Sequence, residues 1–156
     1  MTENKPTKFY SERQEKYIAN QLGWEVVTGS GARDCHPGDV KSDTYLGECK
    51  THTTVKKYIL MRRLWWNKIV EEAEAQHRIP ALFADNGDLS NIWVLTHKTM
   101  YDNSSIIELP SKHILTNISF RADDLDKNQI YFISAWSKYN NSVLILSLEK
   151  FKELIG

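Results

Sequence analysis

The chain has few cysteines, no long apolar run and no excess of charge of either sign. Two cysteines, Cys35 and Cys49, in 156 residues are too few for a disulfide framework, so we expect reduced thiols in a cytoplasm. No stretch approaches the roughly 18 apolar residues of a membrane span, and the N-terminus lacks the apolar run of a secretory signal. We therefore expect a cytoplasmic protein without a membrane segment.

The composition is typical of an ordinary globular domain. Hydrophobic residues make up 41% and charged residues 26% of the chain, which suits one core and excludes a disordered or fibrous protein. The formal net charge is zero, but residues 1–68 hold 12 Lys and Arg against 8 Asp and Glu, whereas residues 69–156 hold 8 against 12. The basic part contains the candidate site described below, which is compatible with a polyanionic partner.

Periodicity and turn residues predict alternating helices and strands. Ser11-Glu12-Arg13-Gln14 has the form of a capping box, so a helix is expected to begin there and to end at Gly23. Residues 58–78 are predicted to be helical for most of their length, with Pro80 ending the helix, and residues 147–155 form a closing helix. Strands are expected in 24–28, from 39 onwards, and in 45–50, 81–84, 92–96, 129–135 and 142–146. This order predicts one α/β domain with a mixed sheet.

A Glu-x-Lys triplet at the end of one predicted strand is the candidate functional motif. Roughly one such triplet is expected by chance in this composition, and a second copy, Glu3-Asn4-Lys5, lies in a polar tail. Glu48-Cys49-Lys50 instead closes a strand, where alternation places Glu48 and Lys50 on one face and Cys49 on the other. Asp39 lies nine residues upstream, across a short turn. The two carboxylates are therefore expected to converge.

Two converging carboxylates form a hard, oxygen-rich site of the kind that Mg²⁺ prefers. A bound Mg²⁺ keeps several waters and leaves room for a phosphate. A lysine beside it positions the attacking water or takes its proton, and offsets negative charge in the transition state. Asp39, Glu48 and Lys50 thus supply the groups that hydrolysis of a phosphodiester needs. The alternative is a solvated hairpin with an ordinary surface Glu–Lys pair.

The segment of about residues 10–100 resembles the PD-(D/E)xK nuclease superfamily, and within it the Holliday junction resolvases of archaea and phages. The resemblance rests on Glu12 placed eleven residues before Gly23-Trp24, on the loop Gly29-Ser30-Gly31-Ala32-Arg33, and on Asp39 followed by Glu48-Cys49-Lys50. The proline of the family name is replaced by Gly38, a common replacement in the resolvase branch. The segment after residue 100 is longer than a minimal resolvase requires.

The resemblance implies a restriction-endonuclease-like fold in a single domain, with a catalytic core over about 10–100 and a strand-helix extension over about 101–156. It implies a structure-selective endonuclease that resolves four-way DNA junctions as a homodimer. The expected cofactor is Mg²⁺, for which Mn²⁺ would substitute, with no organic cofactor. The setting would be a bacterial or archaeal cytoplasm or that of a phage-infected host.

The matched positions take their roles from this resemblance. Glu12, Asp39, Glu48 and Lys50 would be catalytic. Asp39, Glu48 and the backbone carbonyl of Cys49 would hold the metal, and Glu12 would join them either directly or through a water. Glu15 competes with Glu12 for that role, because a helical wheel places it beside the apolar positions of the first helix. Glu12 is preferred.

Several residues are expected to contact DNA. The resemblance implies that Ser30 contacts a phosphate or supports the metal shell, and that its flanking glycines, including Gly31, let the DNA backbone approach closely. The basic stretch before and within the predicted second helix would neutralise phosphates without reading the sequence. The full set is Ser30, Gly31, Arg33, Lys56, Lys57, Arg62, Arg63 and Lys68, with His36 as a further candidate.

Other interpretations of the same residues stay open. Cys35-His36 with Cys49 and His52 has ligand types suited to zinc, although strand alternation opposes it. Trp65 and Trp66 are adjacent on a helix and cannot both face one core, so one of them is a candidate for a dimer interface. For the whole chain, the alternatives are a restriction or repair nuclease acting on linear or damaged duplex and a non-catalytic DNA-binding module. The intact acidic and basic groups argue against the last.

Overall fold

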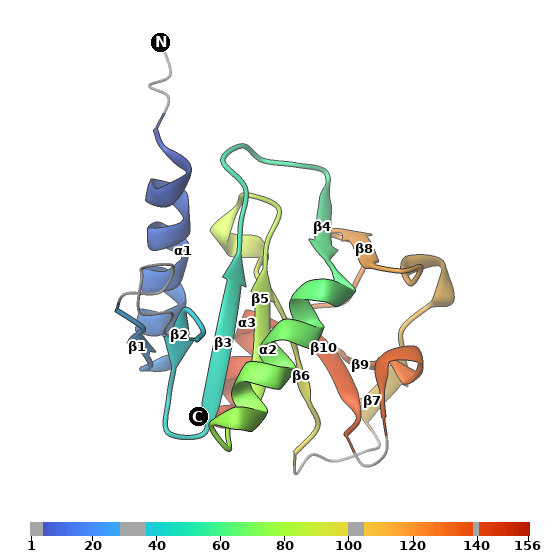
Figure 1. Ribbon diagram of the computed structural model, residues 1–156. Coiled ribbons are helices and arrows are strands. Elements are labelled where there is room, and N and C mark those ends of the chain that lie inside the picture. The colour runs from blue at the N-terminus through green and yellow to red at the C-terminus, as the bar shows by residue number, and fades with distance from the viewer. Residues whose placement is uncertain (1–4, 29–36, 100–104, 139–140) are drawn as a thin grey trace.

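The computed structural model describes residues 5–28, 37–99, 105–138 and 141–156. These residues form a single α/β domain with a mixed eight-stranded sheet, a separate two-stranded sheet and three α-helices (Figure 1). The helices are α1 (Thr7–Leu22), α2 (Arg63–Ala75) and α3 (Leu148–Ile155). The strands are β1 (Glu25–Val26), β2 (Val40–Lys41), β3 (Tyr45–Lys50), β4 (Tyr58–Met61), β5 (Ile79–Ala84), β6 (Trp93–His97), β7 (Ile106–Glu108), β8 (Ile118–Arg121), β9 (Ile130–Phe132) and β10 (Val143–Ser147).

The large sheet has the strand order β1-β2-β3-β5-β6-β10-β9-β7. β3 and β5 run parallel, with Glu48 opposite Leu82, and α2 makes the crossover between them. β7 and β9 are also parallel, whereas the other neighbouring pairs are antiparallel. β4 pairs with β8 in the small sheet. The predicted hairpin from Asp39 to Lys50 is confirmed as the β2–β3 pair.

The sheet separates two apolar cores. On one face α1 and α3 pack through Ile18 and Phe151 against Phe83 of β5. On the other face α2 packs through Trp66 and Ile69, together with the small sheet. Alternation along β3 sends Leu46 to the α2 side and Tyr45 to the α1 side, so residues of each parity on this strand meet a different helix. No helix of the described ranges is long and apolar enough to cross a membrane.

The predicted start of the first helix is wrong. α1 begins at Thr7, with Pro6 at the N-cap, so Ser11 lies within the helix rather than at its cap. The Gln14 side chain does not return to the helix start, because its amide donates to the Lys50 carbonyl 2.7 Å away. The predicted end is confirmed, since Gly23 adopts a left-handed conformation (φ 69°) and its N–H donates to Ala19.

The predicted helix over residues 58–78 is wrong at both ends. Residues 58–61 form β4, in which Ile59 and Met61 are fully buried and pair with β8. Because β8 lies some 60 residues later, only a tertiary contact reveals this strand. The helix ends at Ala75, before Pro80, and Pro80 lies inside β5, where its carbonyl accepts the Thr96 hydroxyl (2.7 Å). β7 and β8 were not predicted either.

Candidate active site

The Glu48-Cys49-Lys50 triplet lies at the end of β3 with the alternation that its spacing predicts. The Glu48 carboxylate and the Lys50 ammonium are on the α2 side, 3.6 Å apart. Cys49 packs against the core on the α1 side. Glu48 is only 7% exposed, so its charge interacts strongly with the groups around it.

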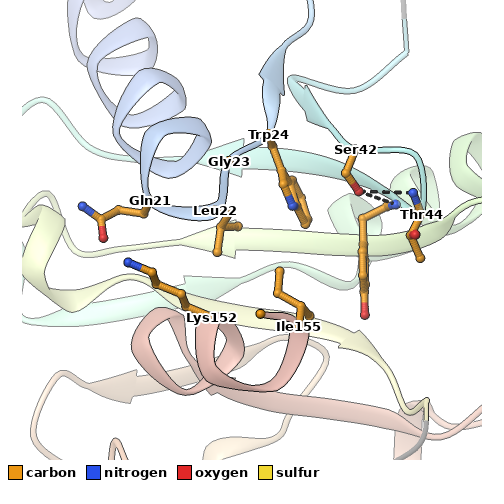
Figure 2. A pocket seen from close by; sticks show the side chains of 10 residues that line it. Gln21, Leu22, Gly23, Trp24, Ser42, Thr44, Lys152 and Ile155 are labelled. Carbon is orange, nitrogen blue, oxygen red and sulfur yellow. Dashed lines mark hydrogen bonds between the residues drawn. The ribbon is translucent and has the colours of Figure 1, made fainter.

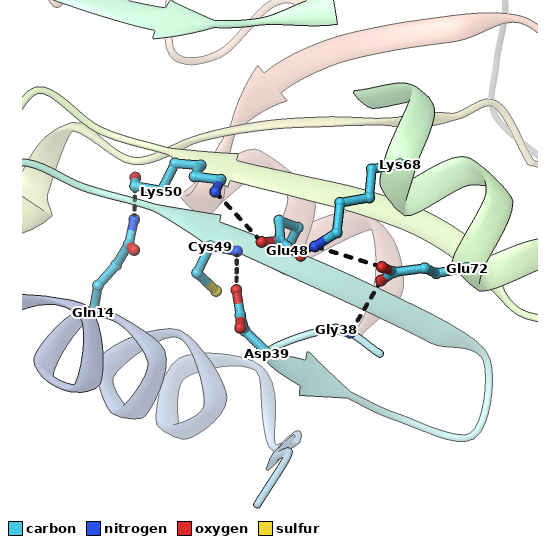
Figure 3. A network of polar contacts seen from close by, with 8 residues as sticks. All are labelled: Gln14, Gly38, Asp39, Glu48, Cys49, Lys50, Lys68 and Glu72. Carbon is cyan, nitrogen blue, oxygen red and sulfur yellow. Dashed lines mark hydrogen bonds and ion pairs between the residues drawn. The ribbon is translucent and has the colours of Figure 1, made fainter. Parts of the chain in front are cut away.

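Asp39 is held against β3 by two hydrogen bonds. Its backbone N–H donates to Gly47 (2.8 Å), and its Oδ2 accepts the Cys49 N–H (2.8 Å), as Figure 3 shows. Gly47 permits the close packing of this region, because a Cβ there would lie 2.7 Å from Phe83 and 2.8 Å from Val40. The turn and the pairing thus fix the Asp39 carboxylate beside the backbone between Glu48 and Lys50.

A lysine and a glutamate of α2 complete the charged cluster. Lys68 Nζ lies 3.5 Å from Glu48 Oε2 and 3.4 Å from Glu72 Oε1. Glu72 Oε2 in turn accepts the Gly38 N–H (3.2 Å), so α2 is linked to both the strand and the segment before Asp39 (Figure 3). The sequence indicated Lys68 as a surface DNA contact, whereas the structure places it at the candidate site. Glu72 was missed, although it stands one turn after Lys68.

The cluster has more negative than positive charge. Burial and the Asp39 carboxylate raise the pKa of Glu48 above its ordinary value, even though Lys68 and Lys50 oppose the shift. Burial opposes the charged form of Lys68, but Glu48 and Glu72 outweigh it and raise the pKa of that ammonium. The charges of Asp39 and Glu72 acting on Glu48, and those of Glu48 and Glu72 acting on Lys68, indicate a negative potential, which favours binding of a further cation.

Glu15 is an α1 carboxylate whose pKa is raised by its burial and by the cluster. Burial first, and then Asp39, Glu12 and Glu48, raise the pKa of Glu15 to about 7. Glu12 has a half-exposed side chain that pairs with Lys8 at 3.8 Å. The structure therefore brings Glu15 into electrostatic contact with Asp39 and Glu48, and favours it as the acidic group that α1 adds to them.

Gln14 is a further residue of the site that the sequence did not indicate. It is fully buried, and its Nε2 donates to the Lys50 carbonyl (2.7 Å) and to Asp85 Oδ2 (3.0 Å). Asp85, at the end of β5, also accepts the Thr51 hydroxyl (2.7 Å). One amide thus connects α1 with the ends of two adjacent strands. Its position four residues before buried Ile18 was the available signal.

The expected DNA contacts are not gathered in one place. Lys56 and Lys57 are exposed on the segment after β3. The Arg62 guanidinium lies over the Trp65 ring at 5.8 Å, whereas that of Arg63 lies over Trp136 at 5.5 Å, a residue of the C-terminal third. Ser30, Gly31, Arg33, Cys35 and His36 lie outside the described residues.

Trp65 and Trp66 are adjacent on α2 and, as expected, face different environments. Trp66 is 3% exposed in the core, edge-on to His97. Trp65 is half-buried at the surface, and Lys50 Nζ lies 5.1 Å from its ring centroid. Trp65 therefore borders the candidate active site.

The described residues contain no group of three or more His, Cys, Asp or Glu side chains placed to hold a metal ion. Of the four residues in the zinc hypothesis, the described ranges contain Cys49 and His52. These ranges provide no third side chain that would join the two as a metal ligand. A divalent ion at β3 would depend on the Asp39 and Glu48 carboxylates, a backbone carbonyl and water. The negative potential of the cluster fits such an ion, and the small number of protein ligands suits Mg²⁺, which keeps several waters.

A hollow of about 360 Å³ lies at the other end of β3, between the ends of α1 and α3 and the turn before Tyr45 (Figure 2). Trp24, Leu22 and Ile155 contribute apolar walls, and Lys152 contributes a charged group. The described residues that line it include the hydroxyl groups of Ser42, Thr44 and Tyr45 but no Asp, Glu, His or Cys side chain. The lining therefore lacks the carboxylate pair found in the cluster at the end that carries Lys50.

Comparison of the chain with protein-family models, with curated proteins and with solved structures finds no match in any of the three. The functional argument therefore depends on the site itself.

Proposed function

We propose that this protein is a metal-dependent DNA endonuclease of the PD-(D/E)xK type that cleaves four-way junctions. The observation that carries the proposal is the convergence of Asp39, Glu48 and Lys50 at one end of β3, with Asp39 Oδ2 bonded to the Cys49 N–H. The spacing of these residues alone is weak evidence. Their joint position on two paired strands is much more specific.

The topology around the site supports a restriction-endonuclease-like core. A helix precedes the β2–β3 hairpin, α2 follows, and β5 then pairs in parallel with β3 before β6 returns antiparallel. In open α/β sheets, ligands bind outside the carboxyl ends of parallel strands. Lys50 and Ala84 are paired at that edge, where Gln14 and Asp85 also meet.

Asp39, Glu48 and the carbonyl of Cys49 would hold Mg²⁺ or Mn²⁺, with Glu15 adding negative charge from α1. The bound ion would polarise the phosphate and lower the pKa of a coordinated water. Lys50, held beside Glu48 and against Trp65, would position the attacking water and offset charge that develops on phosphorus. The water oxygen bonds to phosphorus while the bond to one sugar oxygen breaks, and the departing oxygen takes up a proton.

The junction specificity and the homodimer are parts of the same proposal. Resolution needs two symmetric cuts, and a two-fold dimer provides two sites at a fixed separation. Exposed Leu64 and Leu115, at 73% and 85% exposure, are available for a contact between subunits. A nuclease acting on linear or damaged duplex would have the same catalytic groups, so the substrate has to be decided by experiment.

The test compares wild type with Glu48→Ala on labelled four-way junctions and on linear duplex, with Mg²⁺ and with chelator. We expect wild type to cut the junction only with the metal, and the variant to be slower by at least about 1000-fold, because it loses a metal ligand. A thermal melt supplies a second measurement, since Mg²⁺ should stabilise wild type and not the variant.

Junction cleavage that survives in Glu48→Ala would remove this site from the reaction. Equal cleavage of both substrates would favour the alternative nuclease and eliminate the resolvase. Junction binding by wild type without cleavage under any metal would instead support the non-catalytic DNA-binding module.

A further inference from the structure

One face of α2 runs along the candidate active site. Trp65, Lys68 and Glu72 are spaced three and four residues apart, so they lie on the same side of the helix. Each meets a different point of the hairpin: Trp65 lies under the Lys50 ammonium, Lys68 contacts Glu48, and Glu72 accepts the Gly38 N–H. The helix therefore forms a charged wall of the site rather than only an apolar cover for the sheet.

Lys68 differs from the other basic residues of its stretch in being held at the catalytic carboxylate. Its ammonium lies within 3.5 Å of Glu48 and 3.4 Å of Glu72, while its side chain is still 59% exposed. The carboxylates of Glu48 and Glu72 fix the position of the Lys68 ammonium, and part of the Lys68 side chain stays open to solvent. A lysine that served only for DNA affinity would gain nothing from this orientation, because phosphates are attracted by any nearby surface cation.

Glu72 makes this placement specific. It is mostly buried, at 21% side-chain exposure, and its two oxygens have different partners, Lys68 for Oε1 and Gly38 N–H for Oε2. Since Gly38 immediately precedes Asp39, movement of the carboxylate segment and placement of Lys68 are coupled through one side chain. Glu72 contacts no reacting atom and is a positioning residue.

We infer that Lys68 is a second catalytic lysine, which contacts a non-bridging oxygen of the scissile phosphate and stabilises the charge that develops there, with Glu72 holding it in place. This inference depends on the proposed nuclease function and adds to it. A donor aimed at developing charge accelerates the chemical step, whereas a surface cation strengthens ground-state binding. Lys50 and Lys68 would then approach the phosphate from the strand and from the helix respectively.

The experiment separates rate from binding. The variants are Lys68→Met, which removes the charge at similar length, and Lys68→Arg, which keeps it. Lys112→Met is the matched control, on an exposed basic residue outside the expected DNA contacts. Junction affinity is measured by fluorescence anisotropy in Ca²⁺, and the cleavage rate by single turnover at saturating protein in Mg²⁺. We expect Lys68→Met to lower the rate about 100-fold and to change the dissociation constant by less than about threefold.

The controls should behave differently. Lys112→Met should leave both the junction affinity and the saturated rate unchanged, and Lys68→Arg should recover most of the rate. Glu72→Gln keeps an acceptor for the Gly38 N–H but loses the charge that holds Lys68, so its rate should fall about tenfold or less. Thermal melting of each variant checks that the fold is intact.

Two outcomes overturn the inference while wild type remains active. Lys68→Met cleaving at the wild-type rate but binding more weakly makes Lys68 an ordinary surface contact. Equal loss of rate in Lys68→Met and Lys68→Arg, with a lowered melting temperature in both, makes it a structural residue. An inactive wild type is a different result, because it overturns the proposed nuclease function for all variants together.

Discussion

The two helices that flank β3 contact it with different chemistry. From α1, fully buried Gln14 donates hydrogen bonds of 2.7 and 3.0 Å to the Lys50 carbonyl and to Asp85. From α2, Lys68 forms ion pairs of 3.4 Å with Glu72 and 3.5 Å with Glu48, at a partly exposed surface. One helix is joined to the strand by a neutral amide in the core, and the other by charges at the solvent boundary.

The α1 contact is expected to contribute mainly to stability, and the α2 contacts mainly to activity. Loss of the Gln14 amide takes this buried donor from Asp85 Oδ2 at a cost of about 1–3 kcal/mol, whereas the Lys50 carbonyl still accepts the Asp85 N–H at 3.3 Å. The α1 contact therefore helps to fix the end of β3. The α2 ion pairs share Lys68, whose side chain is 59% exposed, so water screens that end of each pair. These contacts can therefore be exchanged for a substrate or a metal more readily than the buried amide. We therefore expect mutations of the α1 contact to lower the free energy of unfolding and mutations of the α2 contact to alter the activity.

The largest effect on stability is expected for Gln14→Glu. This change replaces a donor by an acceptor that faces the Lys50 carbonyl and the Asp85 carboxylate. A buried charge without a partner should lower the free energy of unfolding by about 3 kcal/mol or more at pH 8. Urea denaturation measures it, and acidification should reduce the difference, because protonation restores a donor.

Gln14→Leu is the matched control for this prediction. It removes the amide without adding a charge, and it also removes Gln14 Oε1, which is buried without a hydrogen-bond partner. We expect a smaller loss, of about 1–2 kcal/mol. Equal destabilisation by both variants would show that packing volume, rather than the hydrogen bonds to Lys50 and Asp85, matters at this position.

A pH-dependent effect is expected for Glu15→Gln in metal-free protein. The pKa of Glu15 is raised from 4.5 to about 7 by burial and by neighbouring carboxylates. A raised pKa means that the folded state holds the proton more tightly than the unfolded state, so stability is lost as the pH increases from 4.5 through 7. The variant lacks this titration and should be more stable than wild type at pH 8 but not at pH 4.

Thermal melts in chelator across this pH range test the prediction. Glu12→Gln is the control, because Glu12 is half exposed and pairs with Lys8 at the surface. If Glu12→Gln shows the larger gain at high pH, then Glu12 is the α1 carboxylate coupled to the site, as the resemblance alone had suggested.

Local patterns were sufficient for the central hairpin and insufficient for β4. The alternation of Glu48, Cys49 and Lys50 needs only the two-residue repeat of a strand, and the structure follows it. The segment 58–61 has no Gly or Pro and continues into a true helix, so nothing local marks a boundary. Its strand conformation comes from pairing with residues 118–121, a contact that sequence periodicity cannot reveal.

The polar residues that α1 contributes to the site were predicted less completely than the strands of the site. The helical wheel placed Glu15 beside the apolar stripe, whereas the family spacing favoured Glu12. The choice of Glu12 stays a prediction, which the melts of Glu15→Gln and Glu12→Gln test. Gln14 was assigned to a capping box because its spacing from Ser11 fitted one. Buried polar residues are recognised by their partners, and the partners of Gln14 are 36 and 71 residues away.

The smallest effect on stability is expected for Lys68→Met. Its side chain is 59% exposed, so water screens its ion pairs with Glu48 and Glu72. Removing it leaves Glu48 with Lys50 as a remaining cation at 3.6 Å. The free energy of unfolding should change by less than about 1 kcal/mol, even though the cleavage rate falls.

Urea denaturation of Lys68→Met beside Gln14→Leu completes the comparison of the two helices. A loss for Lys68→Met as large as that for Gln14→Leu would mean that the α2 ion pairs stabilise the fold as strongly as the buried α1 amide. The proposed difference between the α1 and α2 contacts would then be wrong. Lys68 would be bound too firmly to Glu48 to leave it for a phosphate oxygen.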